Sequence, residues 1–487
     1  MSQEFLGRDE QSQDAFSRAV EQAASNVIAH FGTLEQCYSG MPPTQTARLF
    51  DGIDLCPEQG RALKDVLDWV GANILRNSIA VTHPHTMAHL HCPPLIPAVA
   101  AEVMIAASNP SMDSWDQAPA ATYLEQEMVK WLLGLFGLGG SGDGVFTSGG
   151  TQSNFMGLLL ARDVFAREQL GWNIQTKGLP PQASRLRILC SEMAHFSVQK
   201  SAAILGLGYD AVVPVPADAD RQMDPEALRQ TIARLREQEL LPFALVGTAG
   251  TTDFGSVDPL HALADVAAQE KLWLHVDAAY GGALMLSRKH SRLLSGIERA
   301  DSVTVDFHKL FFQPISCSAL LIKDAADWEV IRYHADYLNP EENENAGVLD
   351  LVTKSIQTTR RFDGLKIFVT LQTLGRERFA ALVDGVLALA EEGAQLVRND
   401  PDLQLMAPPR MASVVFRYAA QGLDETTLEH INTVARRQLL LDGEALIGMT
   451  RVDDHACVKF TLMNPRTRAE DLSRILEAFK RCARSLL

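Results

Sequence analysis

The sequence predicts an α/β fold built on a mostly parallel, seven-stranded sheet, and two observations carry that prediction. Short β-rich runs recur at residues 145–147, 186–190, 211–215, 243–248, 272–276, 302–306 and 318–322. Most are separated by segments with apolar residues at helical spacing, as at 154–169, 225–238 and 259–270. Alternating strands and helices favour a parallel sheet covered on both faces, because each crossover lays a helix on the sheet.

Helical and mixed segments flank this central region. Residues 14–30 and 58–79 have helical patterns, and two or three such helices cannot bury their apolar faces without another domain or a second subunit. After a helical run at 365–374, the remainder mixes helices with strands at 413–417 and 458–462. A chain of 487 residues is expected to form two or three domains. We expect an N-terminal helical segment (1–90), a large domain (91–370) and a small α+β domain (371–487).

The composition is that of a globular chain with no nucleic-acid or membrane partner. Hydrophobic residues make up 46% and charged residues 21%, and the net charge of −16 is spread along the sequence. The first residues lack the pattern of a secretory signal, and the longest apolar stretch, 94–107, is too short to span a bilayer. Seven scattered cysteines without a Cys-x-x-Cys pair favour reduced thiols, so we expect a cytoplasmic protein.

Two motifs resemble binding sites but have the wrong context. The Gly-x-Gly-x-x-Gly pattern at 137–142 precedes a strand instead of following one, so it is interpreted as a flexible connection. The run 83–92 contains four histidines and a cysteine but no partner pair at metal-site spacing, so we predict no metal. Its histidines His89 and His91 are interpreted as lining an active site.

Five predicted strands are followed, in order, by small, imidazole, hydroxyl, carboxylate and amine groups. These groups are the turn at 147–154, His195, the turn at 248–252, Asp277 and Lys309. Ligands of open α/β sheets bind at the carboxyl ends of the strands, so these groups are expected to form one site. The structural alternatives are a capped turn, a satisfied histidine, a helix cap and a surface lysine.

The carboxylate and the amine suit pyridoxal phosphate (PLP). That cofactor needs a lysine for its Schiff base and a carboxylate that keeps its pyridine nitrogen protonated, and Lys309 and Asp277 supply them. Free N–H groups where a helix starts, near Gly150 and Thr151, favour a phosphate. An imidazole such as His195 could stack on the cofactor ring.

The ordered set resembles the group II PLP-dependent amino acid decarboxylases, which have the aspartate aminotransferase-like fold type I. The matching pieces are Trp-Asp-Gln-Ala-Pro-Ala-Ala-Thr at 115–122, the turn at 147–154, His195, Gly-Thr-Thr at 250–252, Asp-Ala-Ala-Tyr-Gly-Gly at 277–282 and His308-Lys309. Residues 311–317 and 358–363 are similar to the branch acting on diamino acids. That branch includes L-2,4-diaminobutyrate decarboxylases and siderophore-pathway lysine decarboxylases, so diamine or siderophore biosynthesis is implied.

The resemblance implies a role for each matching residue. Lys309 would carry the Schiff base, Asp277 would pair with the pyridine nitrogen, and His195 would stack on the ring. The phosphate and other cofactor contacts would come from Gly150, Thr151, Thr251 and Ala279, and His89, His91 and Trp115 would line the substrate pocket. His308 would lie near the substrate carboxylate. The family forms obligate homodimers with the active site at the interface, which makes residues 1–90 a dimerisation segment.

Two departures from the family pattern leave roles open. Relatives often carry Asn-Pro-His-Lys where this chain has Asp306-Phe307-His308-Lys309, so a phosphate contact from position 306 is in doubt. The segment 339–355, whose polar part 339–347 is expected to be an exposed, mobile loop, contains no tyrosine to protonate the carbanion. Tyr337, just before it, and His308 are the alternatives for that role.

The predicted function is PLP-dependent decarboxylation of an L-amino acid to an amine, with L-2,4-diaminobutyrate, lysine or ornithine as substrate. Aromatic or acidic amino acids are alternative substrates. Another fold-type-I lyase or an aminotransferase is the alternative reaction. A catalytically silent PLP-fold scaffold is the alternative outside the enzymes, and the intact pair of Asp277 and Lys309 argues against it.

Overall fold

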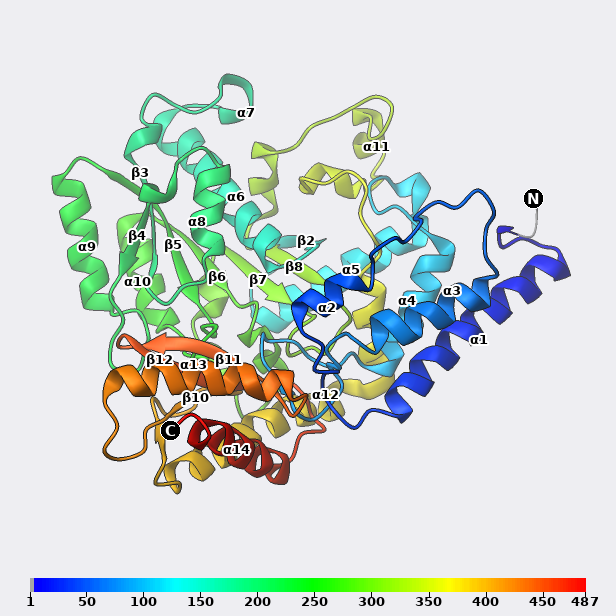
Figure 1. The fold of residues 1–487 in the computed structure, drawn as a ribbon. Coiled ribbons are helices and arrows are strands. Elements are labelled where there is room, and N and C mark those ends of the chain that lie inside the picture. Colours follow the sequence, from blue (N-terminus) through cyan, green and yellow to red (C-terminus); the bar gives the residue numbers. More distant parts are fainter. Residues whose placement is uncertain (1–3) are drawn as a thin grey trace. The chain divides into compact units, whose positions relative to one another are not determined.

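The computed structural model describes residues 4–487, which form two compact units. One unit comprises residues 92–390 and 409–413, and the other joins residues 4–91 to 391–408 and 414–487. Each unit has its own sheet (Figure 1). The three-part division expected from the sequence stays a prediction.

The larger unit is built on the seven-stranded sheet. Its strands are β2 (Asp143–Thr147), β3 (Leu186–Ser191), β4 (Val212–Val215), β5 (Leu241–Thr248), β6 (Trp273–Asp277), β7 (Ser302–Asp306) and β8 (Ser318–Ile322). Their order in space is β2-β8-β7-β6-β5-β3-β4. Among them β8 alone runs opposite to the other strands, and it pairs antiparallel with both β2 and β7. The predicted α/β fold with a mostly parallel seven-stranded sheet is confirmed.

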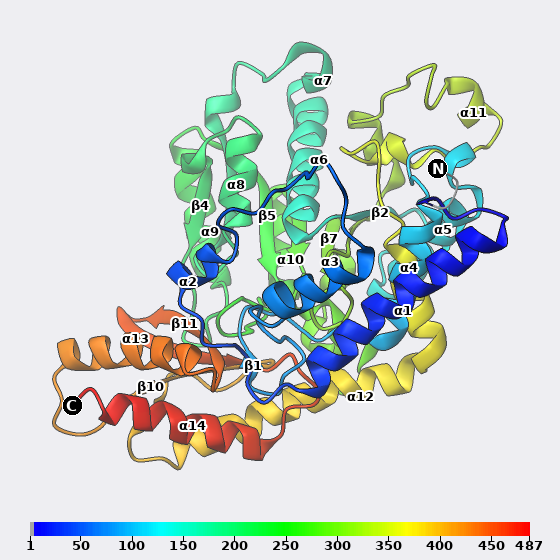
Figure 2. The ribbon, with the colours of Figure 1, turned by 45° about the vertical axis from the view of Figure 1, so that its right-hand side comes forward.

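Helices cover both faces of this sheet. The helices of the larger unit are α4 (Ile96–Ser108), α5 (Pro119–Phe136), α6 (Gly150–Leu170), α7 (Ile174–Lys177), α8 (Ser197–Ile204), α9 (Pro225–Glu237), α10 (Leu260–Glu270), α11 (Glu341–Asn345) and the start of α12 (Gly364–Arg398). Figures 1 and 2 show α6 running along the strands, and it contacts β5 to β8. Val246 packs in a cluster with residues of α6 and α8, whereas its neighbour Gly247 faces Leu260 and Leu263 of α10. Because successive strand residues point to opposite faces, α10 covers the face opposite α6.

Three segments differ in detail from the predicted elements. The helix expected at 58–79 is shorter, with α3 (Leu63–Val70) continuing into a π-helical turn, Gly71–Leu75. The expected loop at 339–347 contains the one-turn helix α11, which begins after Pro340 because proline suits a helix start. The helix α12 extends far beyond 365–374 and is interrupted at Gly375, whose φ of 68° is open to glycine.

The second unit combines helices with a five-stranded sheet. The helices are α1 (Glu10–Gly32), α2 (Pro43–Arg48), α3, the end of α12, α13 (Glu425–Leu441) and α14 (Ala469–Arg484). The sheet order is β1-β11-β12-β10-β9, with β1 (Thr86–Met87), β9 (Leu403–Leu405), β10 (Ser413–Tyr418), β11 (Leu446–Val452) and β12 (His455–Thr461). The strand β1 pairs in parallel with β11, so the N-terminal segment adds a strand to the C-terminal sheet. Among the described residues, no helix has both the length and the apolar character needed to cross a membrane.

Candidate active site

The predicted site residues of the larger unit lie at one edge of the sheet. Strand register aligns the last residue of β5, Thr248, with Asp277, the last residue of β6. The last residue of β7, Asp306, pairs with Ser318 of β8. Parallel strands end at a common edge, so residues far apart in the sequence meet there.

Asp277 is a buried carboxylate whose hydrogen-bond partners are neutral. Its Oδ2 accepts a hydrogen bond from Asn154 Nδ2 of α6 at 2.7 Å, and its Oδ1 accepts one from the Ala279 amide at 3.0 Å. The residue is 7% exposed. The two hydrogen bonds fix the orientation of the carboxylate and leave its negative charge available to another group.

Asn154 ends a chain of hydrogen bonds in which each donor and acceptor can be assigned. Because Asn154 Nδ2 faces a carboxylate, its Oδ1 must accept the hydrogen bond from His275 Nε2 at 3.0 Å. His275 Nδ1 then accepts from the Ser302 hydroxyl at 2.8 Å, and Ser302 Oγ accepts from Trp273 Nε1 at 2.8 Å. The indole N–H of Trp273 can only donate and the carboxylate of Asp277 can only accept. Both ends of the chain therefore require the same direction of hydrogen bonding.

His275 is a neutral imidazole inside the sheet. It is fully buried in β6, and burial lowers the pKa of its imidazole to about 4, although the nearby Asp277 acts in the opposite direction. Gly157 of α6 makes room for the ring, since a Cβ atom there would lie 2.6 Å from it. The sequence pattern predicts no role for His275 beyond its place in the strand at 272–276. A polar residue in the middle of an apolar strand was the available signal.

His195 is tied to the same amide. The Asn154 Nδ2 group also donates to Ser197 Oγ at 2.9 Å, so the Ser197 hydroxyl can donate to His195 Nδ1, 2.9 Å away. The Ser197 amide points at the same nitrogen, at 3.3 Å. Two donors at Nδ1 place the imidazole proton on Nε2. Burial is the largest cause that lowers the pKa of His195, and Lys309 adds to it.

Lys309 and His308 follow the end of β7. Lys309 Nζ lies 3.0 Å from Asp306 Oδ2, and His308 Nε2 lies 3.7 Å from the same oxygen. His308 Nδ1 donates to the Cys317 carbonyl at 2.9 Å, which leaves Nε2 directed toward Asp306. The Lys309 side chain is 21% exposed, so a small molecule can reach its amine.

The turn into α6 has the features of an anion site. Gly149 precedes the helix, which begins at Gly150. The first amides of a helix lack intrahelical acceptors, and those of Gly150 and Thr151 stand at this position. Side chains brace the turn, because Thr147 Oγ1 lies 2.6 Å from Ser153 Oγ and Gln152 Oε1 accepts from the Ser148 amide at 2.8 Å.

The other predicted residues are placed less directly. Thr251 is buried, and its Oγ1 accepts from the Ser256 amide at 3.0 Å, so it shapes its turn. The amide of Trp115 donates to Asp350 Oδ1 at 2.8 Å, which joins the predicted pocket to the segment after α11. His89 and His91 belong to the other compact unit, and their pocket role stays a prediction. Within residues 4–487, no three His, Cys, Asp or Glu side chains form a group that could hold a metal ion.

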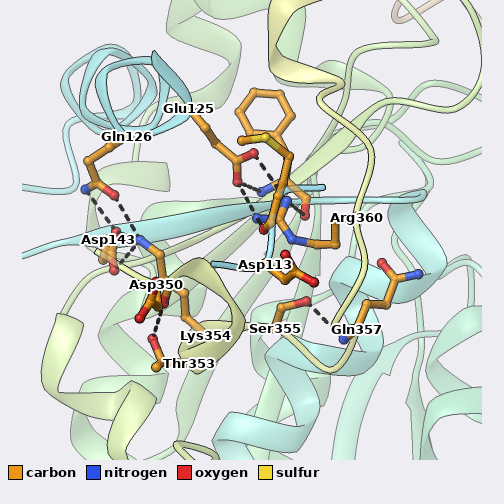
Figure 3. Close-up of polar contacts among 12 residues, drawn as sticks. Asp113, Glu125, Gln126, Asp143, Asp350, Thr353, Lys354, Ser355, Gln357 and Arg360 are labelled. Carbon is orange, nitrogen blue, oxygen red and sulfur yellow. Dashed lines mark hydrogen bonds and ion pairs between the residues drawn. The ribbon is translucent and has the colours of Figure 1, made fainter. Parts of the chain in front are cut away.

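Buried ion pairs anchor the segment that follows the 339–347 loop (Figure 3). Lys354 Nζ lies 2.7 Å from Asp143 Oδ1 of β2. Arg360 pairs with Glu125 of α5 at 2.9 Å, and both side chains are almost completely buried. Arg360 also donates to the carbonyl oxygen of Phe146 in β2, at 3.2 Å. These contacts fix the chain at 354–360 to the sheet, next to the strand that leads into the α6 turn.

The residues at the strand edge fit PLP on chemical grounds. A reachable amine (Lys309), an oriented carboxylate with neutral partners (Asp277) and a helix start (Gly150) occur together in one unit. These are the groups that hold the aldehyde carbon, the pyridine nitrogen and the phosphate of the cofactor.

Comparisons with known proteins agree with this chemistry. The conserved domain of pyridoxal-dependent decarboxylases matches residues 43–419. An L-2,4-diaminobutyrate decarboxylase from Rhizobium meliloti (strain 1021) is 42% identical over 99% of this chain and 94% of its own length. One from Acinetobacter baumannii is 40% identical over 97% of this chain and 93% of its own length.

A solved structure gives the same result. It is the glutamate decarboxylase domain of the diaminobutyrate-pyruvate transaminase and L-2,4-diaminobutyrate decarboxylase from Vibrio parahaemolyticus. It superposes with a TM-score of 0.91 at 41% identity and covers 99% of this chain and 98% of that chain.

Proposed function

This chain belongs to the pyridoxal-dependent decarboxylases and is a PLP-dependent carboxy-lyase acting on an amino acid, and from that premise we propose that it decarboxylates L-2,4-diaminobutyrate. Loss of CO₂ from the α-carbon of this substrate gives 1,3-diaminopropane. The observation that carries the proposal is identity of 40% and 42%, over nearly the full chain, to two enzymes that bear this activity in their names. Lysine and ornithine, which differ in side-chain length, are the nearest alternative substrates.

Bound PLP supplies an electron sink for the electrons of the breaking bond between the α-carbon and the carboxylate. In the proposed site Asp277 holds the proton on the pyridine nitrogen, and Asn154 keeps the carboxylate turned toward it. His195 offers its imidazole face to the ring. The first amides of α6, at Gly150 and Thr151, bind the phosphate.

Two basic residues act at the reacting end of the site. Lys309 would hold the cofactor through its amine. We assign the proton that replaces CO₂ to Nε2 of the His308 imidazolium, which returns to neutral imidazole while its Nδ1–H stays on the Cys317 carbonyl and fixes the ring. Tyr337, which is 88% exposed, is the alternative donor. A His308→Gln variant that kept the wild-type kcat, beside a Tyr337→Phe variant that lost it, would transfer the role to Tyr337.

A substrate panel tests the proposal. We expect CO₂ release to be fastest, measured as kcat/KM, with L-2,4-diaminobutyrate, and slower with ornithine and lysine. Glutamate, cysteine sulfinate and aromatic amino acids serve as acidic and aromatic competitors. Turnover confined to acidic or aromatic substrates would refute the diamino-acid assignment, and formation of a keto acid in place of CO₂ would indicate an aminotransferase.

We further propose a homodimer in the cytoplasm. The helix α4 carries four large apolar side chains that are 40–83% exposed, namely Ile96, Val99, Val103 and Met104. Patches of this kind on a soluble protein are typical of subunit interfaces. Six of the seven free cysteines are buried, which suits a reducing compartment. Light scattering coupled to gel filtration should give twice the mass of 53.4 kDa, and a monomer with full activity would refute the dimer.

A further inference from the structure

Asp306 is a buried carboxylate at the centre of the proposed site. It ends β7, is 3% exposed, and its Oδ1 accepts a hydrogen bond from the hydroxyl of Ser318 at 2.6 Å. Ser318 is its register partner on β8, so this contact is fixed by the sheet. The other oxygen, Oδ2, is therefore held in one direction.

That direction is toward Lys309. Oδ2 lies 3.0 Å from Lys309 Nζ and 3.7 Å from His308 Nε2, and the charges of Asp306, Lys309 and Asp277 all act on His195. An ammonium group and a carboxylate at this distance, with one partner buried, attract each other more strongly than an exposed pair. Asp306 thus holds the Lys309 amine beside its own Oδ2.

The same carboxylate borders the α6 turn. A Cβ atom added to Gly150 would lie 2.8 and 2.9 Å from the two oxygens of Asp306. The negative charge of Asp306 therefore faces both the proposed attachment lysine and the proposed phosphate site. The ion pair joins Oδ2 to the lysine.

We propose that Asp306 is a positioning residue that holds the Lys309 side chain in an ion pair whenever Lys309 is not joined to the cofactor. This role rests on the proposed attachment of PLP to Lys309. It applies to the cofactor-free protein and to the stage of the reaction at which the amine of the substrate has replaced Lys309. Holding the released ammonium keeps Lys309 from returning to the cofactor before the substrate has reacted.

The proposal predicts slow attachment of the cofactor. The ammonium must first give a proton to solvent, and the neutral Nζ then forms a C=N bond with the aldehyde carbon while the aldehyde oxygen leaves as water. The contact between Nζ and Asp306 Oδ2, which Ser318 holds in place, must also break before Nζ can reach the aldehyde carbon, so it slows this condensation. Replacing the charge should accelerate it.

The test follows the yellow absorbance as PLP or pyridoxal is added to cofactor-free full-length protein at neutral pH. Pyridoxal lacks the phosphate, so it separates an effect on Lys309 from an effect on the phosphate site. Asp306→Asn keeps the shape and should accelerate the attachment of both compounds, by roughly tenfold. Ser318→Ala frees the carboxylate without removing it and should accelerate both by about two- to threefold. Asp210→Asn, an exposed carboxylate, is the matched control and should behave as wild type.

The attachment rates of the variants decide whether Asp306 holds Lys309. A rate in Asp306→Asn equal to or below wild type, or an acceleration seen with PLP alone, would overturn the role of Asp306. Should Asp306→Asn fail to fold, Ser318→Ala carries the test, and a wild-type rate there would overturn the proposal. Lys309→Ala separates the two hypotheses: if it still forms the yellow species, the attachment site itself is wrong, whereas its loss of colour leaves only Asp306 in question.

Discussion

Two buried polar networks in the larger unit differ in how they treat charge. Around Arg360 and Lys354 each cation meets a carboxylate, Glu125 or Asp143, so the charges are neutralised within the chain (Figure 3). Around Asp277 the hydrogen-bond partners are an amide side chain and a backbone N–H. We call the network of Arg360 and Lys354 closed, because each of its charges is paired within the chain. Within the described part of the chain the carboxylate of Asp277 has no such partner, and we call it an open charge, available to a cationic group. A buried charge oriented by neutral groups therefore distinguishes a binding position from an anchor.

The largest effect is expected from removing the open charge. Asp277→Asn preserves the shape and should still bind PLP, but kcat should fall by roughly a thousandfold because the pyridine nitrogen loses its counter-ion. Steady-state CO₂ release and the absorbance of the bound cofactor measure both properties. Wild-type turnover in this variant would contradict the role of Asp277.

Substitutions in the closed network of Arg360 and Glu125 should change the free energy of unfolding. Arg360→Met leaves Glu125 buried without its partner and should lower the free energy of unfolding by about 3–5 kcal/mol. Adding Glu125→Leu should recover most of that loss, since both charges are then absent. Chemical denaturation of the two variants checks this. A double variant as unstable as the single one would show that the network is not closed.

His275→Phe tests whether the hydrogen-bond chain orients Asp277. The phenyl ring fills the space but cannot donate to Asn154 Oδ1, so the amide loses one of the contacts that orient it against the carboxylate. We expect kcat to fall about tenfold while PLP stays bound. Ser302→Ala, which removes the contact on the far side of the imidazole, should cost less. Equal activity of wild type and His275→Phe would mean that Asn154 is held by other contacts.

The same residue predicts an acid-sensitive component of stability. His275 has its pKa lowered to about 4 by burial, from an ordinary value of 6.5. Below 6.5 the unfolded chain takes up a proton that the folded protein does not, so the contribution is complete above this value and is lost as the pH falls toward 4. It amounts to up to about 3 kcal/mol. The free energy of unfolding, measured by denaturation, should therefore fall more on acidification for wild type than for His275→Phe. An equal fall in both proteins would refute this.

The smallest effect is expected at the link between the pocket and the α11 segment. Asp350 accepts hydrogen bonds from the Trp115 amide and from Asn343 Nδ2 at 3.1 Å. Asp350→Asn replaces a charged acceptor with a neutral one and should raise KM about threefold with little change in kcat. A change confined to kcat would instead indicate that the segment takes part in the chemical step.

The sequence predicted the sheet, its strand ends and the order of the functional groups, because apolar runs and turn residues encode them locally. It could not predict the partners of Asp277. Asn154 was part of the glycine-rich turn and His275 part of a strand, and only the stacking of α6 on the sheet joins them. Asp306 was noticed as a departure from the family, but its pairing with Lys309 depends on how the chain turns after β7. The ion pairs of Arg360 and Lys354 connect segments more than 200 residues apart, beyond the reach of local patterns.

Reductive trapping of the cofactor identifies the residue that carries it. Borohydride fixes PLP to the residue that carries it, and peptide mass spectrometry locates the added mass. We expect the amine of Lys309 to bind PLP in the site that contains Asp277. The label should therefore fall on Lys309 both in wild type and in Asp277→Asn, which keeps the amine. A label on any other lysine, or none on Lys309, would contradict it.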